Sequence, residues 1–339
     1  MTTLFKNPSC YLYGPGVAKI EEAPYPVIED QHDIVVRIAY VGVCGSDVHF
    51  WNHGGVINKV NSSRPLIMGH EASGTIHAIG TAVTSLQLGD RVAIEPGQPC
   101  RRCETCKAGH YNLCLKMKFA ADPPYSHGTL TKFFKISEDF CYKLPASIGL
   151  KEGVLVEPLA VAVHAARLAY IKAGQSVVVF GAGTVGLLCA AVARAMERFA
   201  GARTHHPTSS FAEENSREIL RANDLSDGVD VVLEATGAST CIETGIFSLK
   251  AGGSFVQVGL SKSRIEFPLL RLSEKEINLK GCFRYNAGDY SLALHFLESG
   301  KISLGELITY TEPFERATDA WERTKGGEGI KTLIQGPQD

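Results

Sequence analysis

The sequence predicts an α/β protein of two parts, a β-rich first part followed by a doubly wound second part. Short β-branched runs separated by Gly, Pro and Asp fill the stretch from Ile34 to about Leu144. From about Val154, apolar runs alternate with helical stretches, which is typical of βαβ units around a parallel sheet. A length of 339 residues favours two domains over one ordinary core.

The first domain, expected at residues 1–153, is predicted to consist mostly of strands and loops. Its β-branched runs are IVVRIAYVGV, GTIHAIG and RVAIEP. A lobe rich in cysteine is expected within it at residues 95–118. The second domain is expected at residues 154–285, with SVVVFGAG, VDVVLEATG and GSFVQVG as strands and LLCAAVARAM as a helix. The remaining segment, 286–339, contains a helical stretch, DYSLALHFLESG, and a last apolar run, KTLIQG.

Composition excludes several classes of protein. With 34 Lys and Arg against 36 Asp and Glu, there is no basic excess for nucleic-acid binding. The apolar stretch Ser176–Ala193 is interrupted by glycines, so it predicts strand, turn and helix rather than a membrane span. The first thirty residues lack the pattern of a signal peptide. Ten cysteines, four of them clustered, favour a reducing cytoplasm over a disulfide scaffold.

Four clustered cysteines predict a structural metal site. Cys100, Cys103, Cys106 and Cys114 have the spacing C-x2-C-x2-C-x7-C, and all four ligands of a tetrahedral Zn²⁺ would be thiolates. A closed tetrathiolate site serves structure rather than catalysis. Four free thiols or an iron–sulfur cluster are the alternatives.

A second set of donors predicts a catalytic zinc. Cys44, His70 and Glu71 supply a thiolate, an imidazole and a carboxylate, and three protein ligands leave one position open for a substrate oxygen. A lone buried cysteine and an ordinary His–Glu hydrogen bond are the alternative interpretation. Ser46 and His49 lie close in sequence, where a hydroxyl and an imidazole can pass a proton to solvent.

A glycine fingerprint predicts dinucleotide binding. Gly181, Gly183 and Gly186 follow the run VVVF and open a helix, as in G-x-G-x-x-G. These glycines permit a tight turn, close approach of a pyrophosphate, and close packing of helix on strand. A βα turn with glycines used only for packing is the alternative.

The partner of this fingerprint is missing from the sequence. An acidic residue about twenty positions on, at the end of a second strand, normally binds the ribose hydroxyls. From Arg198 to Ser210 there is neither a β-branched run nor a carboxylate, and the next acidic residue is Glu213. A strand region is therefore expected to be absent. Arg203 as a ligand of an NADP 2′-phosphate is a weaker alternative.

Several motifs in order resemble the zinc-dependent medium-chain alcohol dehydrogenases, specifically the sorbitol and xylitol dehydrogenase branch. They are GHEASG at 69–74, IEPGQPC at 94–100, VEPLAVAVH at 156–164 and GCFRYNAGDY at 281–290. The resemblance covers nearly the whole chain. It implies a GroES-like catalytic domain, completed by the C-terminal segment 286–339, a Rossmann domain, and a tetramer. Relatives have a further strand ending in Asp where this chain has its gap.

The resemblance also assigns roles to residues. It places catalytic zinc on Cys44, His70 and Glu71, with Glu157 beside it. The remaining implied residues bind substrate or cofactor. The substrate residues are Arg284 and Tyr285, with Phe50 where sorbitol enzymes have a tyrosine; the cofactor residues are Val185, Val258, Gly259, Leu260, Phe283 and Arg284, besides Gly181, Gly183 and Gly186.

The predicted activity is NAD-dependent, zinc-dependent hydride transfer from the small polyol xylitol, giving D-xylulose. Two alternatives remain open at this point. One is an inactive zinc-stabilised subunit with a defective NAD site. The other is a dehydrogenase of sorbitol, L-arabinitol or threonine, because fold alone does not select the substrate.

Overall fold

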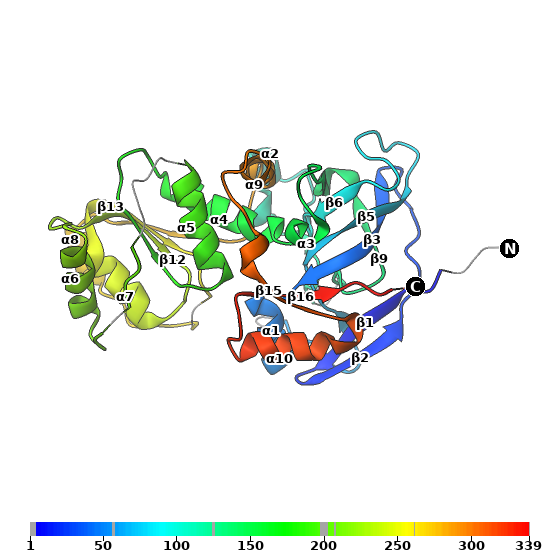
Figure 1. Cartoon of the computed structure of the whole chain (residues 1–339), viewed down its shortest axis with the longest axis horizontal. Helices are drawn as coiled ribbons and strands as arrows, with labels where there is room; N and C mark the ends of the chain where they lie inside the picture. The colour runs from blue at the N-terminus through cyan, green and yellow to red at the C-terminus, as the bar shows by residue number, and fades with distance from the viewer. Residues whose placement is uncertain are drawn as a thin grey trace. The chain divides into compact units, whose positions relative to one another are not determined.

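The structure, a computed structural model, describes residues 5–55, 58–123, 126–196, 203–206, 208–260 and 262–338. The chain forms two compact units, drawn in Figure 1. The first comprises Met1–Glu157 and Asn286–Asp339, and the second comprises Pro158–Tyr285.

The first unit is built on two antiparallel-rich sheets. The smaller sheet has the order β2-β1-β4, with β1 Pro8–Gly14, β2 Val17–Glu22 and β4 Leu66–Ile67. The larger sheet has the order β10-β6-β5-β3-β16-β15, and β9 also pairs with β3. Its strands are β3 Asp33–Gly42, β5 Glu71–Ile79, β6 Arg91–Ile94, β9 Phe133–Ser137, β10 Cys141–Lys143, β15 Ile308–Glu312 and β16 Lys331–Gln335.

Strand β3 is the centre of the larger sheet, because its apolar residues are buried and it pairs with three other strands. Val35, Ile38 and Val41 are almost fully buried. In register with β5, Gly42 lies opposite Glu71, and in register with β16 it lies opposite Leu333. The segment 286–339 thus supplies an inner strand, β16, to the sheet of the first unit.

The helices of the first unit are short. They are α1 Gly45–His53, α2 Glu104–Lys107, α3 Leu150–Gly153, α9 Asp289–Glu298 and α10 Ala317–Lys325, and α4 Val156–Ala169 begins in this unit. Helix α1 packs on α10, where the rings of Trp51 and Trp321 lie 5.3 Å apart. Trp51 Nε1 also donates to Glu322 Oε1 at 2.6 Å. The C-terminal helix therefore holds the helix that carries Ser46 and His49.

The cysteine-rich lobe contains little regular structure. It comprises the two-stranded sheet of β7 Gly97–Gln98 and β8 Lys118–Phe119, helix α2, and a 3₁₀ turn at Tyr111–Leu113. Other 3₁₀ turns of this unit lie at Glu138–Phe140, Gly305–Leu307 and Phe314–Arg316.

The second unit holds a parallel sheet with helices. The strands are β11 Val177–Phe180, β12 Val229–Glu234, β13 Leu249–Gln257 and β14 Asn278–Gly281, and the helices after α4 are α5 Thr184–Met196, α6 Ala212–Ala222, α7 Ser239–Ser248 and α8 Leu269–Glu274. All three strand pairs are parallel. The order β11-β12-β13-β14 follows the chain, so among the described residues β11 is an edge strand.

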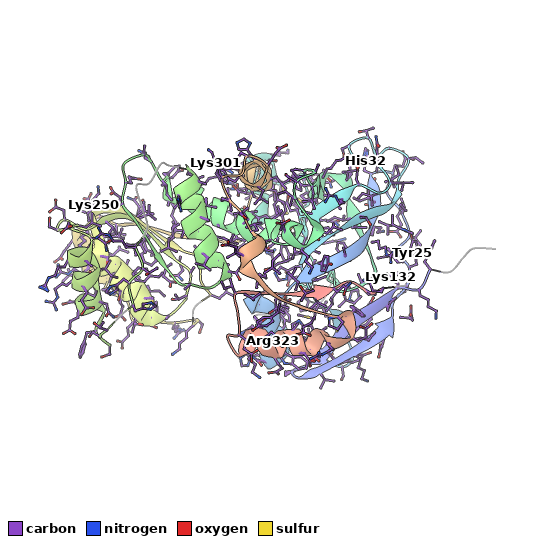
Figure 2. All side chains as sticks on the ribbon, viewed as in Figure 1. Tyr25, His32, Lys132, Lys250, Lys301 and Arg323 are labelled. Atoms are coloured by element: carbon purple, nitrogen blue, oxygen red, sulfur yellow. The ribbon has the colours of Figure 1, made fainter. Side chains whose placement is uncertain are left out.

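Helix α7 packs directly on this sheet and covers its apolar residues. Gly245 of α7 has no room for a side chain, since a Cβ there would lie 2.7 Å from the Phe255 ring. Ile246 and Val232 pack in the same cluster. At the surface, Lys250, labelled in Figure 2, pairs with Asp230. In the described part of the chain, no helix has the length and apolarity needed to cross a membrane.

Candidate functional site

The three residues predicted as catalytic zinc ligands are brought together. One donor atom each of Cys44, His70 and Glu71 lies within 4.8 Å of the other two. Cys44 directly precedes α1, and Glu71 is the first residue of β5, opposite Gly42 of β3. Strand pairing therefore delivers His70 and Glu71 to the end of the strand from which Cys44 follows.

Asp47 orients this centre, and the sequence analysis did not identify it. Its carboxylate accepts the backbone N–H of Cys44 at 2.9 Å and lies 3.6 Å from His70 Nδ1. Burial lowers the pKa of His70, but the Asp47 carboxylate and the Cys44 sulfur raise that pKa well above its usual value. With Nδ1 facing Asp47, Nε2 is the nitrogen left for a metal. The position of Asp47, three residues after Cys44 at the start of a helix, was the available signal.

Lys331 is the second residue that the sequence analysis missed. Its ammonium lies 2.7 Å and 3.0 Å from the two carboxylate oxygens of Glu71 and donates to Val43 O at 3.0 Å. Burial lowers the pKa of Lys331, but Glu71 and Cys44 outweigh it and raise that pKa, with Glu157 adding to the effect. A buried anionic donor set thus has a buried cation beside it. Lysine at the start of the apolar run KTLIQG was the only sequence signal.

The donor set fits a zinc ion. A thiolate, an imidazole and a carboxylate within 4.8 Å are ligands that Zn²⁺ takes at sites with an open position. Glu157, buried in the first turn of α4 in the same unit, is a second carboxylate, and its charge also acts on Lys331.

The predicted proton path lies on one helix. Ser46 and His49 are both half-buried residues of α1, three positions apart. Residues at this spacing face the same side of a helix. The His49 ring lies 4.8 Å from that of His53, and Phe50 packs against the core of the first unit.

The four clustered cysteines also converge. Their sulfurs lie within 4.8 Å of one another, and the pairs Cys103–Cys106 and Cys100–Cys106 are 3.3 Å and 4.0 Å apart. A tetrahedral ion with Zn–S bonds of ~2.3 Å needs sulfurs ~3.8 Å apart. Hydrogen bonds from Thr105 and the backbone of Cys106 lower the pKa of Cys103 to about 6, which favours the thiolate that a metal requires. These residues fit structural zinc.

A buried carboxylate fastens this lobe to the sheet. Glu95, which follows β6, accepts hydrogen bonds from Tyr111 at 2.6 Å and from Tyr142 of β10 at 2.9 Å. Tyr142 stacks on Tyr290 of α9 with ring centroids 5.0 Å apart. Burial raises the pKa of Glu95 to about 7, although the two tyrosine hydrogen bonds lower it.

The glycine fingerprint lies at the carboxyl end of β11 and opens α5. Gly181 has φ of 112°, which a side chain would strain. A Cβ on Gly186 would lie 2.1 Å from Gly181 O, whereas one on Gly183 would meet nothing within 4 Å. Gly186 therefore serves packing, and Gly183 leaves open space where a diphosphate fits at the helix N-terminus.

Glu234, at the end of β12, ties together the two loops beside the fingerprint. Its buried carboxylate accepts hydrogen bonds from Thr236 N at 2.8 Å, Gly237 N at 2.9 Å and Gln257 Nε2 at 2.6 Å. Its backbone oxygen accepts from the N–H groups of Val258 and Gly259, each at 2.8 Å. The backbone donors of these two predicted cofactor residues are therefore already used within the protein.

The remaining predicted residues divide between the units. Phe50 and Glu157 belong to the first unit, and Arg284 and Tyr285 to the second. Arg284 has φ of 57° and stacks its guanidinium on the ring of Phe283 at 4.6 Å. The other cofactor positions follow β13 or open α5: Val185 lies in the first turn of α5, and Leu260, which follows β13, is exposed.

Among the described residues between α5 and α6, none lies in a strand. Residues 197–202 and 207 of this stretch lie outside them. Arg203 donates to Ala222 O at 2.7 Å, at the end of α6, rather than lying on a strand beside β11. This position gives no support to Arg203 as a ligand of a 2′-phosphate.

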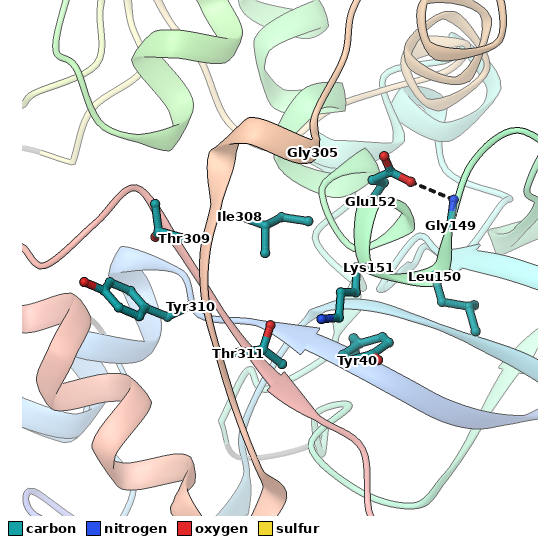
Figure 3. Close-up of a pocket in the computed structure, with 10 residues that line it drawn as sticks. All are labelled: Tyr40, Gly149, Leu150, Lys151, Glu152, Gly305, Ile308, Thr309, Tyr310 and Thr311. Atoms are coloured by element: carbon teal, nitrogen blue, oxygen red, sulfur yellow. Dashed lines mark hydrogen bonds between the residues drawn. The ribbon is translucent and has the colours of Figure 1, made fainter.

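A separate open pocket of about 640 Å³ lies in the first unit between α3, β3 and β15. Figure 3 shows Lys151 beside Tyr40, its ammonium 5.5 Å from the ring centroid, and Glu152 accepting the N–H of Gly149. None of its ten lining residues is a metal donor or a predicted site residue. The chemistry is therefore assigned to the metal centre and not to this pocket.

Comparison with known proteins gives two family matches. Residues 30–146 match the alcohol dehydrogenase GroES-like domain, and residues 173–299 match the zinc-binding dehydrogenase domain.

Curated relatives match along the whole chain. It is 48% identical over 356 aligned positions to the probable D-xylulose reductase A of Aspergillus clavatus, covering 100% of this chain and 99% of that protein. It is 49% identical to D-xylulose reductase A of Aspergillus niger, covering 98% of this chain and 97% of that protein.

Solved structures agree on the fold. The L-idonate 5-dehydrogenase of Escherichia coli superposes with a TM-score of 0.86 at 26% identity, covering 98% of both chains. The predicted α/β fold with GroES-like and Rossmann domains is thereby confirmed. Taken with the two clusters of metal donors and the glycine fingerprint, these matches show that the chain belongs to the zinc-binding dehydrogenases with an alcohol dehydrogenase GroES-like domain.

Proposed function

We propose that this chain is an NAD-dependent zinc polyol dehydrogenase that oxidises xylitol to D-xylulose. The observation that carries the proposal is the convergence of Cys44, His70 and Glu71 within 4.8 Å. The similarity to proteins named D-xylulose reductase supports the choice of substrate. A zinc ion bound at this centre supplies an electrophile for the alcohol oxygen, and NAD supplies the hydride acceptor.

The chain's own residues have separate tasks in this reaction. Asp47 fixes the ring of His70 so that Nε2 faces the metal position. Lys331 balances the charge of Glu71 in a buried site. Ser46 and His49, on one face of α1, carry the hydroxyl proton to solvent, because a hydroxyl and an imidazole can each accept and donate a proton.

Substrate selection is assigned to four residues. Arg284, Tyr285 and Glu157 hold polyol hydroxyls in this proposal. Phe50 offers no hydroxyl where sorbitol enzymes resemble one another in having tyrosine, so the polyol receives one hydrogen bond fewer there. The fingerprint at Gly181, Gly183 and Gly186 holds the cofactor diphosphate, and Val185, Val258, Gly259, Leu260 and Phe283 surround the cofactor.

The direct test uses zinc-loaded protein with xylitol and NAD, followed by NADH absorbance. Turnover is expected for the native chain and loss of turnover for Cys44→Ser, which removes a metal ligand. Comparison of kcat/KM for xylitol, sorbitol and L-arabinitol tests the substrate, with xylitol expected highest. Absence of turnover in the zinc-loaded native chain would contradict the proposal.

One observation favours a second candidate, a zinc-stabilised subunit without dehydrogenase activity. In the described part of the second unit, β11 has no strand on its outer side, where a complete cofactor domain continues. This candidate predicts assembly with an intact relative without any added turnover, which size-exclusion chromatography combined with the assay measures.

Assembly and location complete the proposal. We propose a homo-oligomer, a tetramer as in the resembling family, because Leu269, Leu270 and Leu279 of the second unit are 65%, 72% and 46% exposed. Light scattering measures this state. None of the ten cysteines forms a disulfide, which supports a reducing cytoplasm. A fluorescent fusion tests that location.

A further inference from the structure

We infer that this chain binds its nicotinamide cofactor through the mononucleotide half alone, so that nicotinamide mononucleotide is a ligand and hydride acceptor nearly equal to NAD. The inference rests on the proposed function only in taking a nicotinamide cofactor. It concerns the chemical class of cofactor that the second unit recognises.

The sheet of the second unit carries only one of the two halves that bind a dinucleotide. A complete fold has the strand order 3-2-1-4-5-6, and the ligand lies across the point where the order reverses. The fingerprint strand β11 corresponds to strand 1, and β12, β13 and β14 follow it on one side in chain order. Among the described residues no strand lies on its other side, so the order of the described strands does not reverse.

The described residues between α5 and α6 are bound to α6 instead. Arg203 donates to Ala222 O at 2.7 Å, and Thr208 donates to the Glu218 carboxylate at 2.6 Å. Ser209 N donates to Asn215 Oδ1 at 3.1 Å. This part of the link therefore follows α6, and its residues do not extend the sheet at β11.

The sequence also lacks the carboxylate that would recognise the ribose of the adenosine half. A carboxylate about twenty residues after the fingerprint binds the ribose hydroxyls of the adenosine half. No Asp or Glu stands between Arg198 and Ala212. The alignment to the Aspergillus clavatus relative has 356 positions and this chain 339 residues, a difference of 17 positions, which is enough for the absent strand and its connection.

The described residues contain the half of the site that would bind the nicotinamide mononucleotide. Gly183 leaves room for a phosphate at the N-terminus of α5, and Gly186 packs that helix on the Gly181 carbonyl. Glu234 and Gln257 hold the loops that follow β12 and β13. The side of the sheet that is complete is the side opposite the ribose carboxylate, which is where the nicotinamide half belongs.

The reaction balances with the smaller cofactor. The alcohol carbon gives a hydride to C4 of the nicotinamide ring, the hydroxyl proton goes to solvent, and the products are the ketone and the reduced mononucleotide. The reacting ring is the same in both cofactors, so no other oxidant is needed. Only the adenosine contacts distinguish NAD from the mononucleotide.

Equilibrium binding tests the inference without any substrate. Isothermal titration calorimetry of the zinc-loaded full chain measures binding of nicotinamide mononucleotide, NAD and AMP, and fluorescence follows binding of the reduced forms of the two nicotinamide ligands. NAD is expected to bind no more than about tenfold tighter than the mononucleotide, and AMP is expected not to compete. Loss of a charged hydrogen-bond pair to ribose alone accounts for a factor of roughly 10–150. A dehydrogenase with a complete six-stranded domain is the comparator. Its preference for NAD over the mononucleotide should be larger by this factor of roughly 10–150.

A graded pair of variants checks that the fingerprint is the site. Gly183→Ala and Gly183→Val add atoms in open space, so the fold tolerates them, while the phosphate loses room. Both variants should weaken the mononucleotide and NAD by the same factor, Val more than Ala. NAD binding more than 100-fold tighter than the mononucleotide, or competition by AMP, would overturn the inference. Failure of xylitol turnover with mononucleotide binding intact would instead refute the proposed function alone.

Discussion

At the scale of single residues, the metal centre depends on two side chains that are not metal donors. Asp47 receives the N–H of Cys44 and faces Nδ1 of His70, so it fixes two donors at once. Lys331 lies against both oxygens of Glu71 and fixes the third. Asp47 and Lys331 therefore both help to position the metal ligands.

Replacing Asp47 by Asn should weaken zinc binding by roughly 10- to 100-fold, because an outer partner of a ligating histidine is lost. The expected readout is zinc affinity from chelator competition, together with a fall in kcat. Asp227→Asn, at an exposed position, is the matched control and should change neither quantity. Unchanged zinc affinity in the Asp47 variant would refute the role given to Asp47.

Replacing Lys331 by Met should destabilise the zinc-depleted protein more than the zinc-loaded protein. Without a metal, the variant leaves the buried carboxylate of Glu71 unpaired, which costs ~3–5 kcal/mol of unfolding free energy. With zinc bound, the metal offsets that charge. Urea unfolding with and without added zinc measures the difference, and Lys250→Met, at a half-exposed ion pair, is the control. An equal loss in both states would contradict the pairing.

In the second unit, Glu234 positions the loops beside the glycine fingerprint. Glu234→Gln replaces one carboxylate oxygen by an amide NH2 group, so a donor faces the N–H group of either Thr236 or Gly237. Cofactor affinity measured by calorimetry should fall several-fold while zinc content stays unchanged. The double variant with Gln257→Glu restores one donor–acceptor pair and should recover part of the loss. If the single variant binds cofactor normally, the network has no positioning role.

At the scale of elements, one buried carboxylate joins the cysteine-rich lobe to the sheet. The pKa of Glu95 is raised to about 7, above its ordinary value of 4.5. Between these two pH values the folded chain binds more protons than the unfolded chain, so the stability contributed by neutral Glu95 is lost as pH rises towards 7. The attachment of the cysteine-rich lobe to the sheet is thus most stable in mild acid.

Glu95→Gln should remove that part of the pH dependence. The unfolding free energy of the wild-type chain should fall between pH 5 and pH 8 more steeply than that of the variant, measured by urea unfolding of zinc-loaded protein. Glu322→Gln is the matched control: hydrogen bonds from Trp51 and Lys325 lower the pKa of Glu322, so this carboxylate stays ionised and its loss should be nearly constant over this range. Parallel pH profiles for the wild type and the Glu95 variant would contradict the assignment.

At the scale of the whole molecule, sequence reasoning succeeded where chemistry lies within a short stretch. The cysteine spacing and the glycine fingerprint are local patterns, and the β-branched runs predicted β3, β6, β11 and β12 well. Lys331 and Glu95 could not be found this way. Their partners are chosen by strand pairing and packing across the fold, as when β16 places Lys331 beside Glu71, 260 residues away in sequence.

The gap in the second unit was predicted, but its structural outcome was not. The absence of a β-branched run after Met196 indicated a lost strand, whereas the attachment of Arg203 and Ser209 to α6 depends on side-chain contacts that no local pattern reveals. Among the described strands, β11 is therefore at the edge of its sheet.

The position of β16 has a consequence for how the chain matures on the ribosome. Residues 158–285 form one unit and are synthesised before β16, so their core is able to close while synthesis continues. The sheet begun by β3 lacks its inner neighbour, and Glu71 lacks its ammonium partner, until residues 331–335 have emerged. The first half of the polypeptide to be made is thus the last to become native, and nascent chains halted before Ala317 would lack both the inner strand beside β3 and the ammonium group beside Glu71.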